Sequence, residues 1–167
     1  MVRVDVNQAD VLRTVTEHLR RALDLNERTC YEVTEPLAPP AIPKGGDFFV
    51  TVCAGDGEFP EEMQVGGAED QCTELIELVV TGYTRLKLDQ TDHETQLLHH
   101  DHRGLLEIKR RILKALVGVD AIDPESGATF LRQVITAAHS SRPAYDQKNQ
   151  LGFISLSFRV SWDWDLS

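Results

Sequence analysis

The segment LGFISLSFRVSWDWDL, residues 151–166, limits the fold more than any other part of the sequence. Apolar and polar side chains alternate through it, and a period of two is typical of a β-strand with one buried face. A strand of this length reaches about 50 Å, whereas most strands in globular domains have about five or six residues. We therefore expect one face of the strand to lie in the core and the other to be exposed to solvent. Because the strand is longer than a compact monomer needs, we also expect part of it to contact another molecule. The apolar positions are Ile154, Leu156, Phe158, Val160, Trp162 and Trp164.

A second long segment, TELIELVVTGYTRLKL at residues 73–88, has the same period. Five of its even positions are apolar and its odd ones include Glu77, Thr81, Arg85 and Lys87, so it also predicts a strand. The apolar even positions are Ile76, Leu78, Val80, Leu86 and Leu88. Gly82 within it indicates a bulge or a bend. Residues 28–33 and 47–53 have strand composition, and residues 128–143 favour an edge strand because β-branched and aromatic residues cluster there.

Two helices complete the predicted fold. Residues 7–24 place apolar side chains three and four positions apart after Asn7, a good N-cap residue, and their charged side is interpreted as a solvated face. Residues 95–117 repeat the spacing and end before Gly118, and Thr91 with Glu94 matches a capping box. The order of elements predicts one α+β domain over residues 1–167. Its sheet is largely antiparallel, or mixed, with helices packed on one face.

Composition and charge narrow the function. The 167 residues include 41% hydrophobic and 26% charged residues, as in folded globular proteins. The 17 basic and 27 acidic residues give a net charge of −10, which repels phosphate and disfavours a DNA-reading protein. No window approaches the length of a membrane span and no export signal is recognised, so we expect no membrane association. Cys30, Cys53 and Cys72 are far apart, which favours a reducing cytoplasm over disulfides.

Two loops stand out between the predicted strands. Residues 34–46 contain four prolines and two glycines, which prevent regular hydrogen bonding there. Residues 54–71 hold six acids, no bases and four glycines, and predict a long acidic loop. Loops of such length in a compact domain are uncommon and often functional. We treat both as insertions in the domain and as candidate docking elements, while a plain solvated insertion is the alternative.

The segment HETQLLHHDHRG, residues 93–104, holds four of the six histidines and admits three interpretations: a metal site, a protonation switch or the polar side of a helix. Within a helix only His99 and His102 have the spacing at which two ligands converge. His102 also falls on the apolar stripe of the predicted helix. We therefore interpret the segment as the polar side and entry turn of the second helix.

A metal centre would need ligands from elsewhere in the chain, and His139 and Asp146 are the candidates. Ser140 and Ser141 follow His139, but adjacency along a strand is not the geometry of a nucleophile and its base. The sequence also lacks the GxSxG, P-loop, GxGxxG, HExxH and CxxC motifs. We predict no catalytic residue, no metal and no cofactor.

The order of these segments resembles a known family. An N-terminal helix, a Pro-rich approach to a short strand, a long strand, the helix GLLEIKRRILKAL and the closing strand SLSFRVSWDWDL are similar to the tail terminator, or tail completion, proteins of long-tailed bacteriophages. The resemblance covers nearly the whole chain and depends on pattern, not on a signature motif. It implies an α+β fold and a structural protein without catalysis.

The resemblance also implies a place in the virion. Such proteins form a ring, usually of six subunits, that caps the tail tube, ends its polymerisation and offers a surface to head-completion proteins. Assembly would take place in the host cytoplasm, with itself, the tube protein and a head-completion or connector protein as partners. An acidic lumen would let DNA pass without binding it.

Three alternatives remain open from the sequence. One is another ring-forming neck or tail-tube component, because tube and terminator proteins share a core. Another is a metal-dependent hydrolase that uses His99 and His102. The third is a bacterial adaptor domain unrelated to phage.

Overall fold

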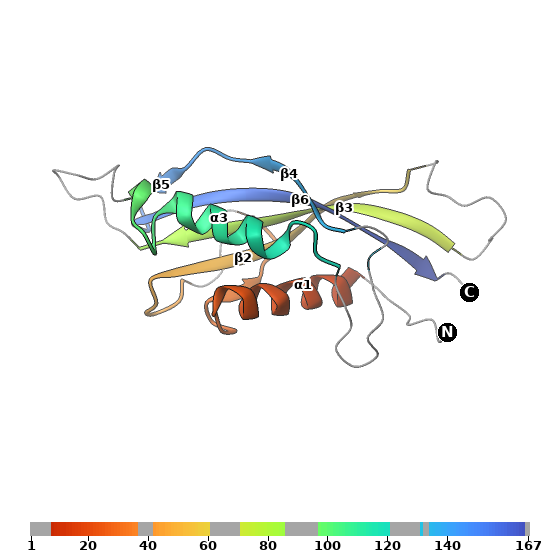
Figure 1. The fold of residues 1–167 in the computed structure, drawn as a ribbon, viewed down its shortest axis with the longest axis horizontal. Helices are drawn as coiled ribbons and strands as arrows, with labels where there is room; N and C mark the ends of the chain where they lie inside the picture. The colour runs from red at the N-terminus through yellow and green to blue at the C-terminus, as the bar shows by residue number, and fades with distance from the viewer. Residues whose placement is uncertain are drawn as a thin grey trace.

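The computed structural model describes residues 8–36, 42–60, 71–85, 97–120, 131 and 134–165. A six-stranded sheet carries both described long helices, α1 (Gln8–Leu23) and α3 (Leu105–Leu116), on one face (Figure 1). The predicted α+β class with a mixed sheet is confirmed. The strands are β1 (Cys30–Glu32), β2 (Phe48–Glu58), β3 (Gln71–Thr84), β4 (Thr136–Ser140), β5 (Ala144–Asp146) and β6 (Leu151–Asp165).

The strand order is β1-β2-β3-β6-β4, and β5 also pairs with β6. Only the pairing of β1 with β2 is parallel among these strands. Neighbouring parallel strands need a crossover connection of about a dozen residues or more. Residues 33–47 provide that connection, so the Pro-rich segment joins the two parallel strands. Among the described strands β4 pairs only with β6, so residues 136–140 of the predicted edge strand are confirmed. Residues 141–143 are not strand, and residues 128–130 and 132–133 lie outside the described residues.

The core lies between the sheet and the two helices. The even positions from 76 to 80 in β3 and from 154 to 162 in β6 point into it, as the alternation predicts, and Trp162, Phe158 and Leu78 are fully buried. Val15 and Leu19 of α1 and the apolar stripe of α3 cover them. The predicted wet face is wrong in part, because Ser157 and Ser161 on the other side of β6 are also buried. Both faces of the central strands are therefore covered in places.

The prediction of one helix over residues 95–117 is wrong, because α3 begins only at Leu105. A short helical stretch at 97–99 comes first, and a turn follows it. The ring nitrogen Nδ1 of His100 accepts the backbone N–H groups of His102 (3.2 Å) and Arg103 (3.3 Å), which replaces helical bonding there. A Cβ on Gly104 would lie 2.6 Å from the backbone nitrogen of His100, so the turn requires glycine.

The end of this helix follows the sequence. Val117 donates its backbone N–H to the carbonyl of Leu113, and Gly118 adopts a φ of 79°. Glycine tolerates this left-handed conformation without a steric penalty. The predicted stop at Gly118 is confirmed, while Thr91 and Glu94 of the predicted capping box lie outside the described residues.

The predicted acidic loop over residues 54–71 is wrong at both ends. β2 continues to Glu58 and β3 begins at Gln71, with a register shift between Ala54 and Gly57. Pairing with β3 keeps the glycine-rich segment extended, against its local preference. Residues 61–70 of the predicted loop lie outside the described residues.

Gly82 is not the predicted bulge. It pairs in register with Val50 of β2 and Ile154 of β6. A Cβ at this position would lie 2.4 Å from Cγ2 of Ile108 on α3. Glycine therefore lets the helix approach the sheet closely. β3 ends at Thr84, and residues 86–88 of the predicted strand lie outside the described residues.

Candidate functional site

His99, His100 and His102 of the predicted cluster lie at a turn and do not gather into a site, and His93 lies outside the described residues. His99 and His102 are exposed, and the rings of His100 and His102 lie 6.3 Å apart, centre to centre, edge to face. Among the residues that the structure describes, no group of three His, Cys, Asp or Glu side chains is placed to hold a metal ion. The entry-turn interpretation of this segment therefore agrees with the observed His100 contacts.

The remote candidates have other contacts. His139 is exposed on the edge strand β4. Asp146 accepts the backbone N–H of Lys148 (2.9 Å) and the side-chain amide of Asn149 (2.6 Å) in the turn between β5 and β6. These hydrogen bonds, that of the Asn149 side chain above all, lower the pKa of the Asp146 carboxyl. Asp146 therefore stabilises a turn.

The candidate nucleophiles also have structural roles. Ser141 accepts the backbone N–H of Ser155 at Oγ (2.9 Å) and donates to the carbonyl of Arg142 (3.1 Å). Burial raises the pKa of the Cys30 thiol to about 12, and it raises the pKa of the Cys53 thiol as well. A thiol reacts as its thiolate, so both side chains behave as buried apolar groups.

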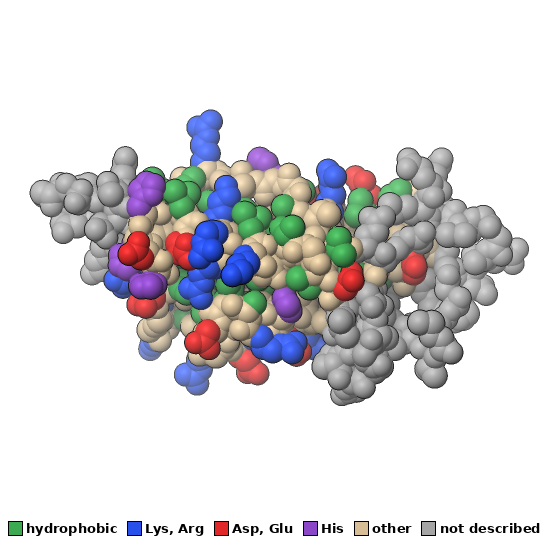
Figure 2. All heavy atoms as spheres, in the orientation of Figure 1, with side chains coloured by type: hydrophobic (Ala, Val, Ile, Leu, Met, Phe, Trp, Pro, Cys, Tyr) green, Lys and Arg blue, Asp and Glu red, His purple; other side chains and the backbone are tan. Residues whose placement is uncertain are grey.

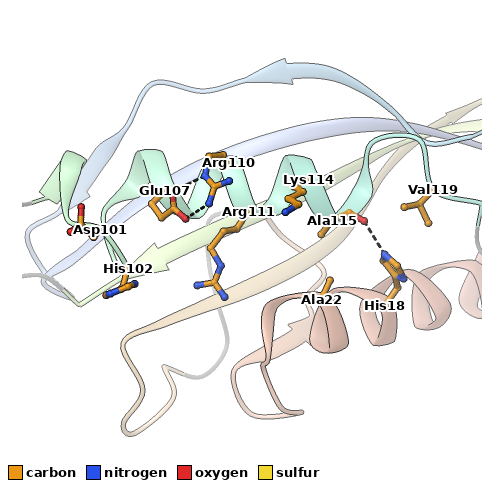
Figure 3. A pocket seen from close by; sticks show the side chains of 10 residues that line it. All are labelled: His18, Ala22, Asp101, His102, Glu107, Arg110, Arg111, Lys114, Ala115 and Val119. Atoms are coloured by element: carbon orange, nitrogen blue, oxygen red, sulfur yellow. Dashed lines mark hydrogen bonds and ion pairs between the residues drawn. The ribbon is translucent and has the colours of Figure 1, made fainter.

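A groove with charged walls lies between α1 and α3 (Figure 3). Its volume is about 610 Å³. His18 of α1 places Nε2 2.8 Å from the carbonyl oxygen of Ala115 and so ties the two helices together at one end. The lining residues are His18, Ala22, Asp101, His102, Glu107, Arg110, Arg111, Lys114, Ala115 and Val119.

Two arginines of the groove are held in place. Arg110 donates two hydrogen bonds to Glu107, at 2.8 and 2.7 Å, and this pairing lowers the pKa of the Glu107 carboxyl. Arg111 lies with its guanidinium carbon 4.9 Å from the centre of the Phe48 ring and donates to the carbonyl of Leu23 (3.1 Å). A cation over an aromatic face and a fixed ion pair both limit side-chain motion. The groove therefore presents positioned guanidinium groups.

The helix layer is basic in an acidic chain. α1 and α3 together carry seven Lys or Arg and three Asp or Glu, a net +4, whereas the whole chain carries −10. Figure 2 shows Lys and Arg side chains gathered over the middle of this face. Residues 7–24 taken alone predict a solvated charged face, because the pattern of one helix carries no information about α3. The available signal was that both helices are basic although the rest of the chain is acidic.

The far end of the sheet is acidic. β3 and β6 pair from Gln71↔Asp165 inward, and β2 joins them only from Glu58↔Leu75. These strands reach beyond the helices (Figure 1). Asp56 and Glu58 are exposed near this end. A pocket there is lined by Asp56, Glu58, Leu75, Ile76, Glu77, Ala138 and Arg159.

The sheet face away from the helices carries a row of aromatic rings across four strands. Phe49 stacks on Tyr83 with ring centres 4.6 Å apart, and Tyr31 and Phe153 flank this pair at 6.5 and 6.1 Å. The carbonyl of Pro36 accepts hydrogen bonds from Thr81 (3.1 Å) and Tyr83 (3.3 Å). The first residues of the predicted docking loop 34–46 therefore contact the outer face of the sheet.

Comparison with known proteins shows a likeness in structure and none in sequence. Neither a family model nor a curated protein matches the sequence. A solved structure titled "Virion of native gene transfer agent (GTA) particle" contains a chain of similar fold, with a TM-score of 0.50 and 14% sequence identity. The match covers 92% of this chain and 94% of that chain. At this identity the likeness shows the fold, and it spans nearly the whole domain.

Proposed function

We propose that the protein is a structural component of a phage-type virion, and more specifically a neck protein that forms a ring on the tail tube. The observation that carries this proposal is the fold shared with a chain of a gene transfer agent virion over 92% of this chain and 94% of the other. Matching nearly end to end favours a whole-subunit relationship over a common small motif. The likeness agrees with the resemblance of the sequence to tail terminator proteins.

The proposed role is that of the tail terminator proteins which the sequence resembles. The ring, of six subunits, caps the tube, ends its polymerisation and joins the tail to the head. Its partners are further copies of itself, the tube protein and a head-completion or connector protein, and assembly takes place in the host cytoplasm. DNA passes through the lumen without specific binding, in keeping with a net charge of −10. No described helix is long and apolar enough to cross a membrane.

The architecture suits a ring subunit in two respects. β3 and β6, of 14 and 15 residues, exceed the usual strand length and reach past the helices. The basic helix layer and the acidic strand end lie at different places on the subunit. Complementary patches at different places on one molecule produce head-to-tail contacts, which close into rings when the rotation between subunits permits. No catalytic or cofactor role enters this proposal.

The two loops remain proposed docking elements. Residues 34–46 and 54–71 would contact a further copy of the chain, the tube or the head-completion protein, and Asp56 and Glu58 belong to the second of them. A chain without residues 56–70 should still fold, because the core of the sheet lies elsewhere, and should fail to form normal rings or to join tails to heads. Normal rings and normal joining by that deletion would remove this part of the proposal.

A second function rests on the same fold likeness, because likeness to a chain of a virion supports a tube protein as well. The two functions differ in how assembly ends. A tube component polymerises into long cylinders, whereas a terminator stops at one ring.

Light scattering after size exclusion, over a concentration series and with negative-stain images, tests the proposal. Closed rings of a single size would support the terminator function, and open-ended cylinders would support the tube function. The same chain should be added to purified tail tubes, because a ring can form on its tube alone. A chain that stays monomeric in solution and does not bind tube ends would contradict both functions.

A further inference from the structure

Basic and acidic residues are concentrated in different parts of this subunit, and the packing of the core does not require that separation. The helix layer carries a net +4, and the rest of the chain therefore holds the whole acidic excess. Residues 54–71, between the middle of β2 and the start of β3, include six acids and no base. A stable monomer gains nothing from distant patches of opposite sign, because exposed charges farther apart than about 10 Å are screened at ordinary salt concentrations.

The basic side of this separation includes a groove whose walls carry three bases against two acids, Asp101 and Glu107. Glu107 is paired with Arg110, so the excess positive charge of the groove comes from Arg111 and Lys114. Arg111 is fixed on Phe48 and on the carbonyl of Leu23, so its guanidinium lies against the groove wall. Arg110 and Lys114 are exposed one helical turn apart on α3. The hydrogen bond of His18 to Ala115 holds α1 against α3 beside them. A volume of about 610 Å³ accommodates a short extended segment and not only an ion.

The acidic side of this separation consists of the end of β2 and the residues that follow it in the sequence. Asp56 and Glu58 are exposed on β2, where it forms one edge of the narrowing sheet. The acids of residues 61–70, which join β2 to β3, are Glu61, Glu62, Glu69 and Asp70. No basic residue of the segment neutralises them locally. The segment has the chemistry that guanidinium groups bind best, since carboxylates accept paired N–H donors.

We infer that the α1–α3 groove of one subunit binds the acidic segment 54–71 of a neighbouring copy of this chain. The groove and the segment lie at different places on the subunit, so each copy offers one of each and the contact is head to tail. Charge steering then selects the correct neighbour and the correct orientation. The inference deepens the proposed function by naming the contact, and it rests on the protein assembling with itself.

Charge reversal on each side tests the inference. The variant Arg110→Glu/Lys114→Glu makes the groove acidic. The variant Asp56→Lys/Glu58→Lys/Glu61→Lys/Glu62→Lys leaves two acids among four new bases and so makes the segment basic, with a net charge of +2. Each variant alone should self-associate about tenfold more weakly than the wild type or worse, as measured by sedimentation over a concentration series. An equimolar mixture of the two should recover assembly, because each interface then joins opposite charges. Arg28→Glu/Lys148→Glu is the matched control, since it reverses two exposed bases outside the groove.

A second measurement separates this contact from ring formation. A synthetic peptide of residues 54–71 is titrated into the full-length wild type and into Arg110→Glu/Lys114→Glu at low and high salt. Binding should weaken about tenfold or more in the variant and at high salt. A peptide with its six acids replaced by Asn and Gln should not bind. Thermal melting of every variant confirms that it remains folded.

The outcomes are distinct. Rings that assemble equally well in both charge-reversal variants would overturn the inference and leave the proposed ring intact. A wild type that never self-associates would count against the ring, and peptide binding lost in Arg110→Glu/Lys114→Glu would still support the groove. Equal binding of the acidic and neutral peptides, or binding of neither, would overturn the inference in either case.

Discussion

The two faces of the sheet use the same strands and the same register but are built from different chemistry. On the helix face, Val50, Gly82 and Ile154 stand side by side beneath α3. On the outer face, the neighbouring row places the rings of Phe49, Tyr83 and Phe153 next to one another. The helix face is held by close packing of aliphatic side chains. The outer face combines ring stacking with hydrogen bonds to the segment that connects β1 to β2.

The two faces contribute differently to the stability of the fold and to the position of the segment between β1 and β2. Aliphatic side chains buried between a sheet and helices supply most of the folding free energy, in proportion to the apolar area removed from water. Stacked rings and single hydrogen bonds contribute about 1 kcal/mol each and depend strongly on direction. The helix face therefore provides stability. The outer face fixes where the crossover connection lies, since Thr81 and Tyr83 both donate to the carbonyl of Pro36.

The largest expected contrast is between two phenylalanines of β6. Phe158 is fully buried on the helix face, whereas Phe153 is half-buried on the outer face. Phe158→Ala should lower the free energy of unfolding by about 3–5 kcal/mol and Phe153→Ala by less than half of that. Urea denaturation of the two variants measures both values. Equal losses would contradict the division of roles between the faces.

The helix face is also the less tolerant of added volume. Gly82→Ala would place a methyl group 2.4 Å from Cγ2 of Ile108 and 3.2 Å from Cδ1 of Ile112. Displacing α3 should lower the free energy of unfolding by about 1–3 kcal/mol. The control is Ala137→Val on exposed β4, which should change it by less than about 0.5 kcal/mol. Thermal melting measures both, and an unchanged Gly82→Ala variant would mean that α3 is not seated on the sheet.

Gly82 also shows how far the sequence predicts this fold. Alternation in residues 151–166 and 73–88 identifies the two long strands because burial on one face leaves a local signature. A glycine in such a strand is equally consistent with a bulge and with close approach of a helix. The deciding contact, with Ile108, joins residues 26 positions apart. Local patterns do not contain that information.

The candidate site has the same limitation. The turn at residues 100–104 depends on the ring of His100 accepting two backbone N–H groups, and a helical periodicity conceals it. The groove joins His18 to Ala115 across 97 positions, so neither helix alone indicates it. The basic character of the groove can be predicted from the sequence, because both helical segments are basic although the chain as a whole is acidic.

The hydroxyl group of Tyr83 on the outer face makes the free energy of unfolding depend on pH in alkaline solution. Burial raises the pKa of Tyr83 to about 12, from an ordinary value of about 10. The folded protein keeps this proton between these values while the unfolded chain releases it, so Tyr83 contributes full stability below pH 10 and loses it as pH rises towards 12. The slope from this group is at most about 1.4 kcal/mol per pH unit.

Tyr83→Phe isolates that contribution. The variant loses the hydrogen bond to Pro36 and should be less stable than the wild type by about 1 kcal/mol at pH 7. The difference should shrink as pH rises above 10, because phenylalanine does not ionise. Urea denaturation at pH 7, 10 and 11 measures it. A difference that stays constant would contradict the position of the hydroxyl group in a buried hydrogen bond.

The smallest expected effect compares two serines on the outer face of β6. Ser155 shares a hydrogen bond of 2.9 Å with Thr81, whereas Oγ of Ser157 is buried with no hydrogen-bond partner among the described residues. Ser155→Ala should cost about 1 kcal/mol, because it leaves Thr81 with one partner fewer. Ser157→Ala removes a buried polar atom without breaking a bond, so it should leave stability unchanged or raise it by up to about 1 kcal/mol. The chemical change is identical and both residues lie on one strand, so the comparison sets a half-buried serine that has a hydrogen bond against a buried one that has none among the described residues. Equal destabilisation by the two substitutions, measured by urea denaturation, would mean that Ser157 has a partner and that polar pairing on the outer face extends further along β6.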